Sequence, residues 1–331
     1  MKALKKARLL KSYYRDGLRG FRLSARAKVL LLKQAPGRFS FALSGCSETN
    51  HIKSEITRRL RLHRIAEATI TMLGAGVAVF RDEKPEVFSP EWVSPDTGIR
   101  IEAPAFYNSR EIKELGTVFV KIRGARAVGV LLTEETAFVT YNLGDSLMKW
   151  EYKAEMRTKA LMKTVLCRDR LAGQYGPDDI QGILFGNSIE LAFELLSNSG
   201  GKNYFILDGN YEDFFYLTND RYGETLLKLL CEAERNDELR EILQSGLEES
   251  RPGWNIEHDA IDEDGNPVLF AYLCNLPRLM RFYTAIRLQG LTGTVICFDF
   301  QEEVLRRYCS EGVRFQIVDF EKMKRRIFVR S

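Results

Sequence analysis

The chain has 331 residues, of which 45% are hydrophobic and 28% are charged, a composition that excludes wholesale disorder and allows about two domains. No apolar run approaches the roughly 20 residues of a membrane-spanning helix. No apolar segment follows the basic N-terminus, as it would in a secretory signal. The six cysteines are scattered and include no CxxC pair, which is usual for proteins of reducing compartments. We therefore expect a cytoplasmic protein that makes no membrane contact.

Charge is distributed unevenly along the chain, although the net formal charge is only +4. Residues 1–64 contain 17 basic and three acidic residues, a charge of +14, whereas the other 267 residues contain 32 basic and 42 acidic residues, a charge of −10. A strongly basic segment joined to an acidic body is typical of contact with a polyanion. Nucleic acid is the first candidate, and a merely solvated basic terminus is the alternative.

The first elements resemble the second half of a winged helix-turn-helix. They are a helix at 2–9, strands at 10–14 and 20–23 around the Asp16-Gly17 turn, and a helix at 25–34 that Ser24 caps and Pro36-Gly37 ends. Asp-Gly is a hairpin-turn dipeptide and serine a preferred helix cap. In a winged helix, one helix enters the major groove of DNA while the ribbon lies along phosphates.

A further helix is predicted at 51–73, and its arginines either extend the basic surface or are simply solvated. The residues that we expect to contact duplex DNA are Lys5, Lys6, Arg8, Lys11, Arg15, Arg19, Arg22, Arg26, Lys28, Arg58, Arg59, Arg61 and Arg64. Arg15 and Arg19 flank the turn of the ribbon, where phosphate contacts are most useful.

The rest of the chain predicts a mixed body. An irregular, proline-bearing stretch at 81–108 precedes strands near 118–122, 126–132 and 136–142 and a long helix at 153–170. Strands and helices alternate after residue 177, and 294–318 reads as a βαβ unit, which implies parallel pairing through a right-handed crossover. The expected fold class is α+β or α/β, with a winged-helix-like DNA-binding module at 1–75, a mixed β/α region at 76–176 and an α/β domain at 177–331.

Pro95-Asp96 with Glu111 and Lys113 matches the PD-(D/E)xK signature of magnesium-dependent nucleases literally. A second Glu-x-Lys, Glu151 and Lys153, follows Asp145. In such enzymes two carboxylates hold Mg²⁺ and the lysine orients the attacking water. However, Glu-x-Lys is expected about twice by chance at this composition, and Asn108–Glu111 is typical of a helix cap. A nuclease that uses Mg²⁺ therefore stays an alternative.

Other catalytic signatures are absent from the sequence. The three histidines, His51, His63 and His258, are too far apart for the paired-histidine metal site of a relaxase, and there is no phosphate-binding glycine loop. We therefore expect a protein without catalysis, cofactor or resident metal.

Several segments are similar to the replication-relaxation family of plasmids and other mobile elements. They are Gly20–Lys28, Phe106–Lys113, Arg126–Leu131 with Tyr141-Asn142, and Met148–Trp150 with Glu155. The resemblance spans about residues 1–235 and implies a winged-helix DNA-binding domain and a role in replication, relaxation or transfer. Ala27 stands where that family tends to have glycine. A complete winged helix has two further helices, for which there are too few residues between Met1 and the 2–9 helix. We therefore expect either that Met1 lies downstream of the native start or that the module is reduced and relies on the 51–73 helix or on a second subunit.

The leading hypothesis is thus a DNA-binding accessory protein of a mobile element. Its expected partners are duplex DNA and element-encoded or host replication and transfer proteins. The sequence leaves open whether the protein forms a homodimer. The alternatives are the nuclease and a protein-interaction adaptor that the basic end tethers to DNA.

Overall fold

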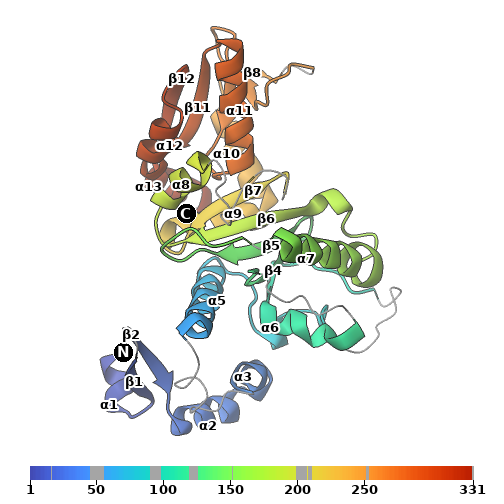
Figure 1. Cartoon of the computed structure of the whole chain (residues 1–331), viewed down its shortest axis with the longest axis vertical. Coiled ribbons are helices and arrows are strands. Elements are labelled where there is room, and N and C mark those ends of the chain that lie inside the picture. The colour runs from blue at the N-terminus through green and yellow to red at the C-terminus, as the bar shows by residue number, and fades with distance from the viewer. Residues whose placement is uncertain are drawn as a thin grey trace.

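The protein is a mixed α+β structure with a small N-terminal module and a larger body (Figure 1). The computed structural model describes residues 1–15, 17–44, 56–89, 98–118, 126–150, 152–198, 207, 211–250 and 253–329. We refer to residues 1–44 as the basic module. Helix α5 (Ile56–Gly74) lies between this module and the body.

The basic module contains the four predicted elements and one more helix. The predicted elements are α1 (Lys2–Lys6), β1 (Leu10–Arg15), β2 (Leu18–Leu23) and α2 (Ala25–Gln34), and the additional helix is α3 (Pro36–Leu43). Strands β1 and β2 pair antiparallel, and the Ser24 hydroxyl accepts a hydrogen bond from the Ala27 amide at 3.1 Å, as the sequence predicts for a helix cap. Pro36 ends α2 as expected but also opens α3, because proline suits the first turn of a helix.

The first sheet of the body has the strand order β3-β4-β5-β6-β7. Its strands are β3 (Ala105–Asn108), β4 (Gly129–Leu132), β5 (Ala137–Asn142), β6 (Ile180–Gly186) and β7 (Phe214–Thr218). β3, β4 and β5 are antiparallel, and β5, β6 and β7 are parallel. Because β6 pairs with β5, the domain boundary that we expected between residues 176 and 177 falls inside one sheet.

The second sheet has the order β12-β11-β10-β9-β8. Its strands are β8 (Glu248–Glu249), β9 (Ala260–Ile261), β10 (Pro267–Phe270), β11 (Gly293–Phe298) and β12 (Val313–Val318). The predicted βαβ unit is confirmed, since β11 and β12 pair parallel around α12 (Glu302–Tyr308). Helix α11 (Leu276–Gln289) begins with Pro277 in its first turn and ends at Gly290, whose φ of +64° suits glycine.

The remaining helices cover the sheets. They are α6 (Ser109–Ile112), α7 (Tyr152–Thr164), α8 (Glu190–Ser197), α9 (Arg221–Cys231), α10 (Ala233–Gln244) and α13 (Phe320–Phe328). The helix predicted at 153–170 changes to a π-helix at Val165–Arg170. The prediction of a strand near 118–122 is wrong at Val118, because Lys113–Val118 forms a 3₁₀-helix. Residues 119–122 lie outside the described residues.

The two sheets share their hydrophobic core. One cluster joins Leu184 of β6 to Val295 of β11, and the other joins Ile183 of β6 to Phe298 of β11. The amide of Tyr216 in β7 also donates to the carbonyl of Cys274, at 2.9 Å, so the edge of the first sheet is bonded to the chain after β10. Among the described residues, no helix has the length and apolar character that crossing a bilayer requires.

Candidate functional site

Three parallel strands of the first sheet are each followed or ended by an asparagine. Asn142 ends β5, Asn187 follows β6 and Asn219 follows β7. Asn219 Nδ2, the side-chain nitrogen, lies 3.2 Å from Asn142 Oδ1 and 2.8 Å from Asn187 Oδ1. We call these three residues the asparagine cluster; it occupies the carboxyl ends of parallel strands, the edge where open α/β sheets place their functional groups.

Helix α5 packs over the asparagine cluster. Asn142 Nδ2 donates to the carbonyl of Arg64 at 2.8 Å, and the Thr71 hydroxyl donates to Asn219 Oδ1 at 3.4 Å. Asn142 Oδ1 also accepts from the amide of Gly144 at 2.9 Å. These bonds fix two turns of α5 against the sheet edge, and they thereby fix the helix that leads to the basic module.

Two carboxylates flank the cluster. Glu67 of α5 accepts from Asn142 Nδ2 at 3.4 Å, and Asp145 accepts from Asn187 Nδ2 at 2.8 Å. Burial raises the pKa of Glu67, the hydrogen bond from Asn142 lowers it in part, and the charge of Asp145 raises it further. Within the described ranges, no three His, Cys, Asp or Glu side chains gather as a metal site would need. The side chains of the asparagine cluster bond to one another and to α5, so the cluster holds this helix in position.

Sequence reasoning missed Glu67 and the asparagine cluster. A signal was available, because an asparagine directly terminates three apolar runs, at Tyr141-Asn142, Gly186-Asn187 and Thr218-Asn219. Asn142 was quoted only as part of the family resemblance. The position of α5 over these strand ends depends on tertiary packing and had no local signal.

The basic module carries a large excess of positive charge, although its Arg38 pairs with Asp82 and Glu83 of the body. Residues 1–44 contain 12 Lys and Arg and one acidic residue, Asp16. Of the residues predicted to contact DNA, Lys6, Arg8, Lys11 and Arg26 are exposed. Lys5, Arg22 and Lys28 are partly buried, with Lys5 Nζ 4.5 Å from the centre of the Phe21 ring. The side chains of Arg15 and Arg19 lie outside the described part of the chain, as does Asp16.

The module buries few of its residues, and it touches α5 through its hairpin and the body through α3, where Arg38 pairs with Asp82 and the Phe39 ring lies 5.7 Å from that of Phe80. Only Ser24 and Ala27 are buried among the described residues of 1–44. The Tyr13 hydroxyl lies 3.4 Å from His63 Nε2 of α5. In Figure 1 the hairpin, α1 and α2 lie at the end of the molecule opposite the second sheet. The hairpin, α1 and α2 therefore lie away from the second sheet, while α3 contacts the body.

The arginines of α5 do not form the exposed surface that we expected. Arg59 is only 3% exposed and is too deeply buried to reach a phosphate. Arg61 is partly buried, and burial together with the charge of Arg126 lowers its pKa. Arg64 is also partly buried, and the side chain of Arg58 lies outside the described part of the structure. Arg59 is therefore not one of the DNA contacts that we predicted, because α5 packs on the sheet and buries this side chain.

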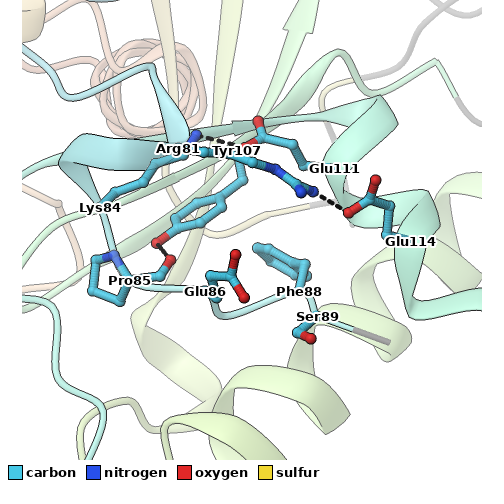
Figure 2. A pocket seen from close by; sticks show the side chains of 9 residues that line it. All are labelled: Arg81, Lys84, Pro85, Glu86, Phe88, Ser89, Tyr107, Glu111 and Glu114. Carbon is cyan, nitrogen blue, oxygen red and sulfur yellow. Dashed lines mark hydrogen bonds and ion pairs between the residues drawn. The ribbon is translucent and has the colours of Figure 1, made fainter. Parts of the chain in front are cut away.

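The first nuclease set is described only at Glu111 and Lys113. Glu111 lies in α6 and Lys113 in the 3₁₀-helix after it, and neither lies on a strand. Glu111 Oε1 is 2.9 Å from Lys84 Nζ beside a cavity of about 50 Å³ (Figure 2). Its Oε2 accepts from the amide of Asn108 at 2.9 Å, which is the predicted helix cap. Asp96 lies outside the described residues.

The second nuclease set is placed only in part. Asp145 follows β5 and bonds to Asn187, while Lys153 is an exposed residue of α7. Glu151 lies outside the residues that the structure describes. The structure thus links Asp145 to the asparagine cluster and gives it no bond to Lys153.

Residues from the family-like segments meet at the start of α7. The amide of Arg126 donates to Glu155 Oε1 at 2.6 Å, and the rings of Tyr141 and Trp150 lie 5.0 Å apart. Burial raises the pKa of Glu155. The Tyr141 hydroxyl is 3.1 Å from that of Tyr211. These segments therefore build one packed polar cluster beneath β5.

A cleft of about 540 Å³ is lined by residues of both sheets and of the helices between them. At its wall Asp259 accepts from both Arg240, at 3.0 Å, and Arg278, at 3.2 Å, and Glu257 accepts from Arg278 at 2.6 Å. The arginines of this cleft are thus neutralised by the body itself, which leaves the basic module as the candidate nucleic-acid interface. No protein-family model, curated protein or solved structure matches the chain.

Proposed function

We propose that this is a cytoplasmic DNA-binding accessory protein of a plasmid or integrative mobile element, acting in replication, relaxation or transfer without catalysis. One observation carries the proposal. The basic module has 12 positive residues and one acidic residue, and Lys6, Arg8, Lys11 and Arg26 are exposed. Such a surface neutralises phosphates and releases the counterions that surround duplex DNA.

In this proposal the module acts as a reduced winged helix. The β1–β2 hairpin lies along the phosphates as the wing, and α2, which Ser24 caps, approaches the groove. Phosphate contacts supply affinity but little sequence information. We therefore expect binding to many duplexes, with a steep dependence on salt.

The body determines where DNA binds. Residues 65–331 carry a charge of −10, so the body as a whole repels a duplex and keeps it at the basic module. The hydrogen bonds from Asn142 to the Arg64 carbonyl and from Thr71 to Asn219 hold α5 on the sheet, and the pairing of Arg38 with Asp82 and Glu83 joins the module to the body.

The role in a mobile element rests on the four family-like segments. Arg126, Tyr141, Trp150 and Glu155 from these segments form one cluster, which supports their belonging to one structural unit. The partners in this role are duplex DNA and element-encoded or host replication and transfer proteins, and a homodimer remains an open alternative.

The test is binding of a labelled duplex to the full-length chain, measured by fluorescence anisotropy. Replacing Lys6, Arg8, Lys11 and Arg26 by alanine should remove up to four phosphate contacts. The negative slope of log affinity against log salt should then become shallower by about 3 to 4. The matched control replaces Arg157, Arg168, Arg287 and Arg314, four exposed residues of the body, and should bind like the wild type. Unchanged binding by the module variant would refute the proposal.

A further inference from the structure

A second exposed basic surface lies at the other end of the chain, on helix α13. This helix buries Phe320, Met323 and Ile327 against the body. That packing fixes its orientation and leaves Lys322, Arg325 and Arg326 exposed. The three residues are spaced i, i+3 and i+4, so they share one face of the helix.

The basic face of α13 contrasts with its surroundings. Residues 65–319 contain 27 basic and 41 acidic residues, a charge of −14, whereas residues 320–331 contain five basic residues and only Glu321. No carboxylate pairs with Lys322, Arg325 or Arg326 in the part of the chain that the structure describes. Elsewhere in the body the exposed Arg307 and Arg314 do pair with carboxylates.

The stability of the helix does not account for this charge. Cations in the last turn, such as Arg325 and Arg326, are favourable at the negative end of the helix dipole, but Lys322 lies in the first turn, where a cation is unfavourable. Lys322 and Arg326 are also like charges at i and i+4, which destabilises a helix by a few tenths of a kcal/mol. An external anion would remove both costs.

Helix α13 is connected to the basic module through two packed helices. The ring of Phe320 lies 4.9 Å from that of Tyr222 in α9, and Phe328 packs under Lys228 near the end of α9. Helix α9 in turn packs against α5, with Glu224 beside Gly74. In Figure 1 α13 and the hairpin both lie on the left-hand side of the molecule.

We infer that α13 is a second phosphate-contact surface, so that one long duplex is held by Lys322, Arg325 and Arg326 as well as by the basic module. The inference rests on the proposed function and adds a footprint to it. The duplex must be long enough to reach from the module to α13. Each of the three contacts makes the negative slope of log affinity against log salt steeper by about 0.9, so α13 steepens this slope by about 2.7 on a long duplex.

The experiment compares three full-length proteins on a long labelled duplex. They are the wild type, the α13 variant Lys322→Ala, Arg325→Ala, Arg326→Ala, and the control Arg157→Ala, Arg287→Ala, Arg314→Ala, which removes the same charge elsewhere. Between about 50 and 200 mM salt, the wild type and the control should lose about 40-fold more affinity than the α13 variant. On a duplex too short to span both surfaces, the three proteins should bind alike.

The outcomes separate this inference from the proposed function. If the module variant loses binding while the α13 variant keeps the wild-type slope on the long duplex, the α13 surface is refuted and the proposed function survives. If no protein binds any duplex, both fail. If vesicles of anionic lipid bind the wild type but not the α13 variant, while DNA binding is equal, α13 is a lipid surface and the inference is wrong. Far-UV circular dichroism of the α13 variant confirms that the helix is retained.

Discussion

Lys84 and Glu111 form an ion pair of 2.9 Å in which the side chains are only 2% and 4% exposed. Lys84 Nζ also donates to the carbonyls of Val79, at 3.2 Å, and of Phe106. The Tyr107 ring covers the ammonium group, whose nitrogen is 4.4 Å from the ring centre (Figure 2). The pair thus joins the chain before β3 to the helix that follows it.

Removing one partner of this pair should be strongly destabilising. Glu111→Leu leaves the Lys84 ammonium buried without its counter-charge, which costs about 3–5 kcal/mol, and it also removes the cap of α6. Urea unfolding followed by circular dichroism measures the loss. The double variant Lys84→Met, Glu111→Leu should recover a large part of it, because both charges are then absent. A single variant as stable as the wild type would contradict the buried-pair interpretation.

The fold could be predicted where a local pattern decides the structure. The Asp16-Gly17 turn predicted β1 and β2, Ser24 predicted the start of α2, and Gly290 predicted the end of α11. Strand order had no such signal. β7 lies at one edge of the first sheet and β8 at one edge of the second, because burial of apolar faces between distant segments decides the pairing.

Asn142 should be essential to the attachment of α5. Its side chain is buried, with the residue 1% exposed, and it bonds to the carbonyl of Arg64 and the amide of Gly144. Asn142→Ala leaves the Gly144 amide unpaired and removes the hydrogen bond to the Arg64 carbonyl, and an unpaired buried group costs about 1–3 kcal/mol. Hydrogen exchange should show faster exchange in α5.

A matched control for this variant is Asn266→Ala. Asn266 bonds mainly to Asp262 in a turn of the second sheet, so its loss should leave exchange in α5 unchanged. Equal exchange in α5 in the two variants would show that the asparagine cluster does not hold that helix.

The candidate site could be predicted only at the level of charge. Composition alone located the positive surface in the first residues, and Lys6, Arg8, Lys11 and Arg26 are indeed exposed. Composition failed for Arg59, because the basic pattern of α5 does not reveal which face packs on the sheet. The Glu111 pattern was compatible with a nuclease strand and with a helix cap, and the capping sequence Asn108–Glu111 correctly favoured the cap.

Stability should depend on pH through Glu67. Its pKa in the folded protein is raised above the ordinary value of 4.5, chiefly by burial, so the folded state binds the proton more tightly than the unfolded state. The contribution of Glu67 to stability is therefore complete below pH 4.5 and is lost as the pH rises through the folded-state value. Thermal unfolding from pH 4 to pH 7 should show the wild type losing stability relative to Glu67→Gln. A constant difference between the two proteins across that range would rule out this titration.

Magnesium should not convert the protein into a nuclease. Glu111 is paired with Lys84, and Asp145 with Asn187, so neither carboxylate is free to bring Mg²⁺ to a water molecule. Supercoiled plasmid incubated with the protein and Mg²⁺ should stay supercoiled, as it does in the matched sample with chelator. Gel electrophoresis detects a single nick. Nicking that requires Mg²⁺ and disappears in Asp145→Asn and in Lys153→Ala would instead establish the second nuclease set, whereas nicking that persists in both variants would mark a contaminating enzyme.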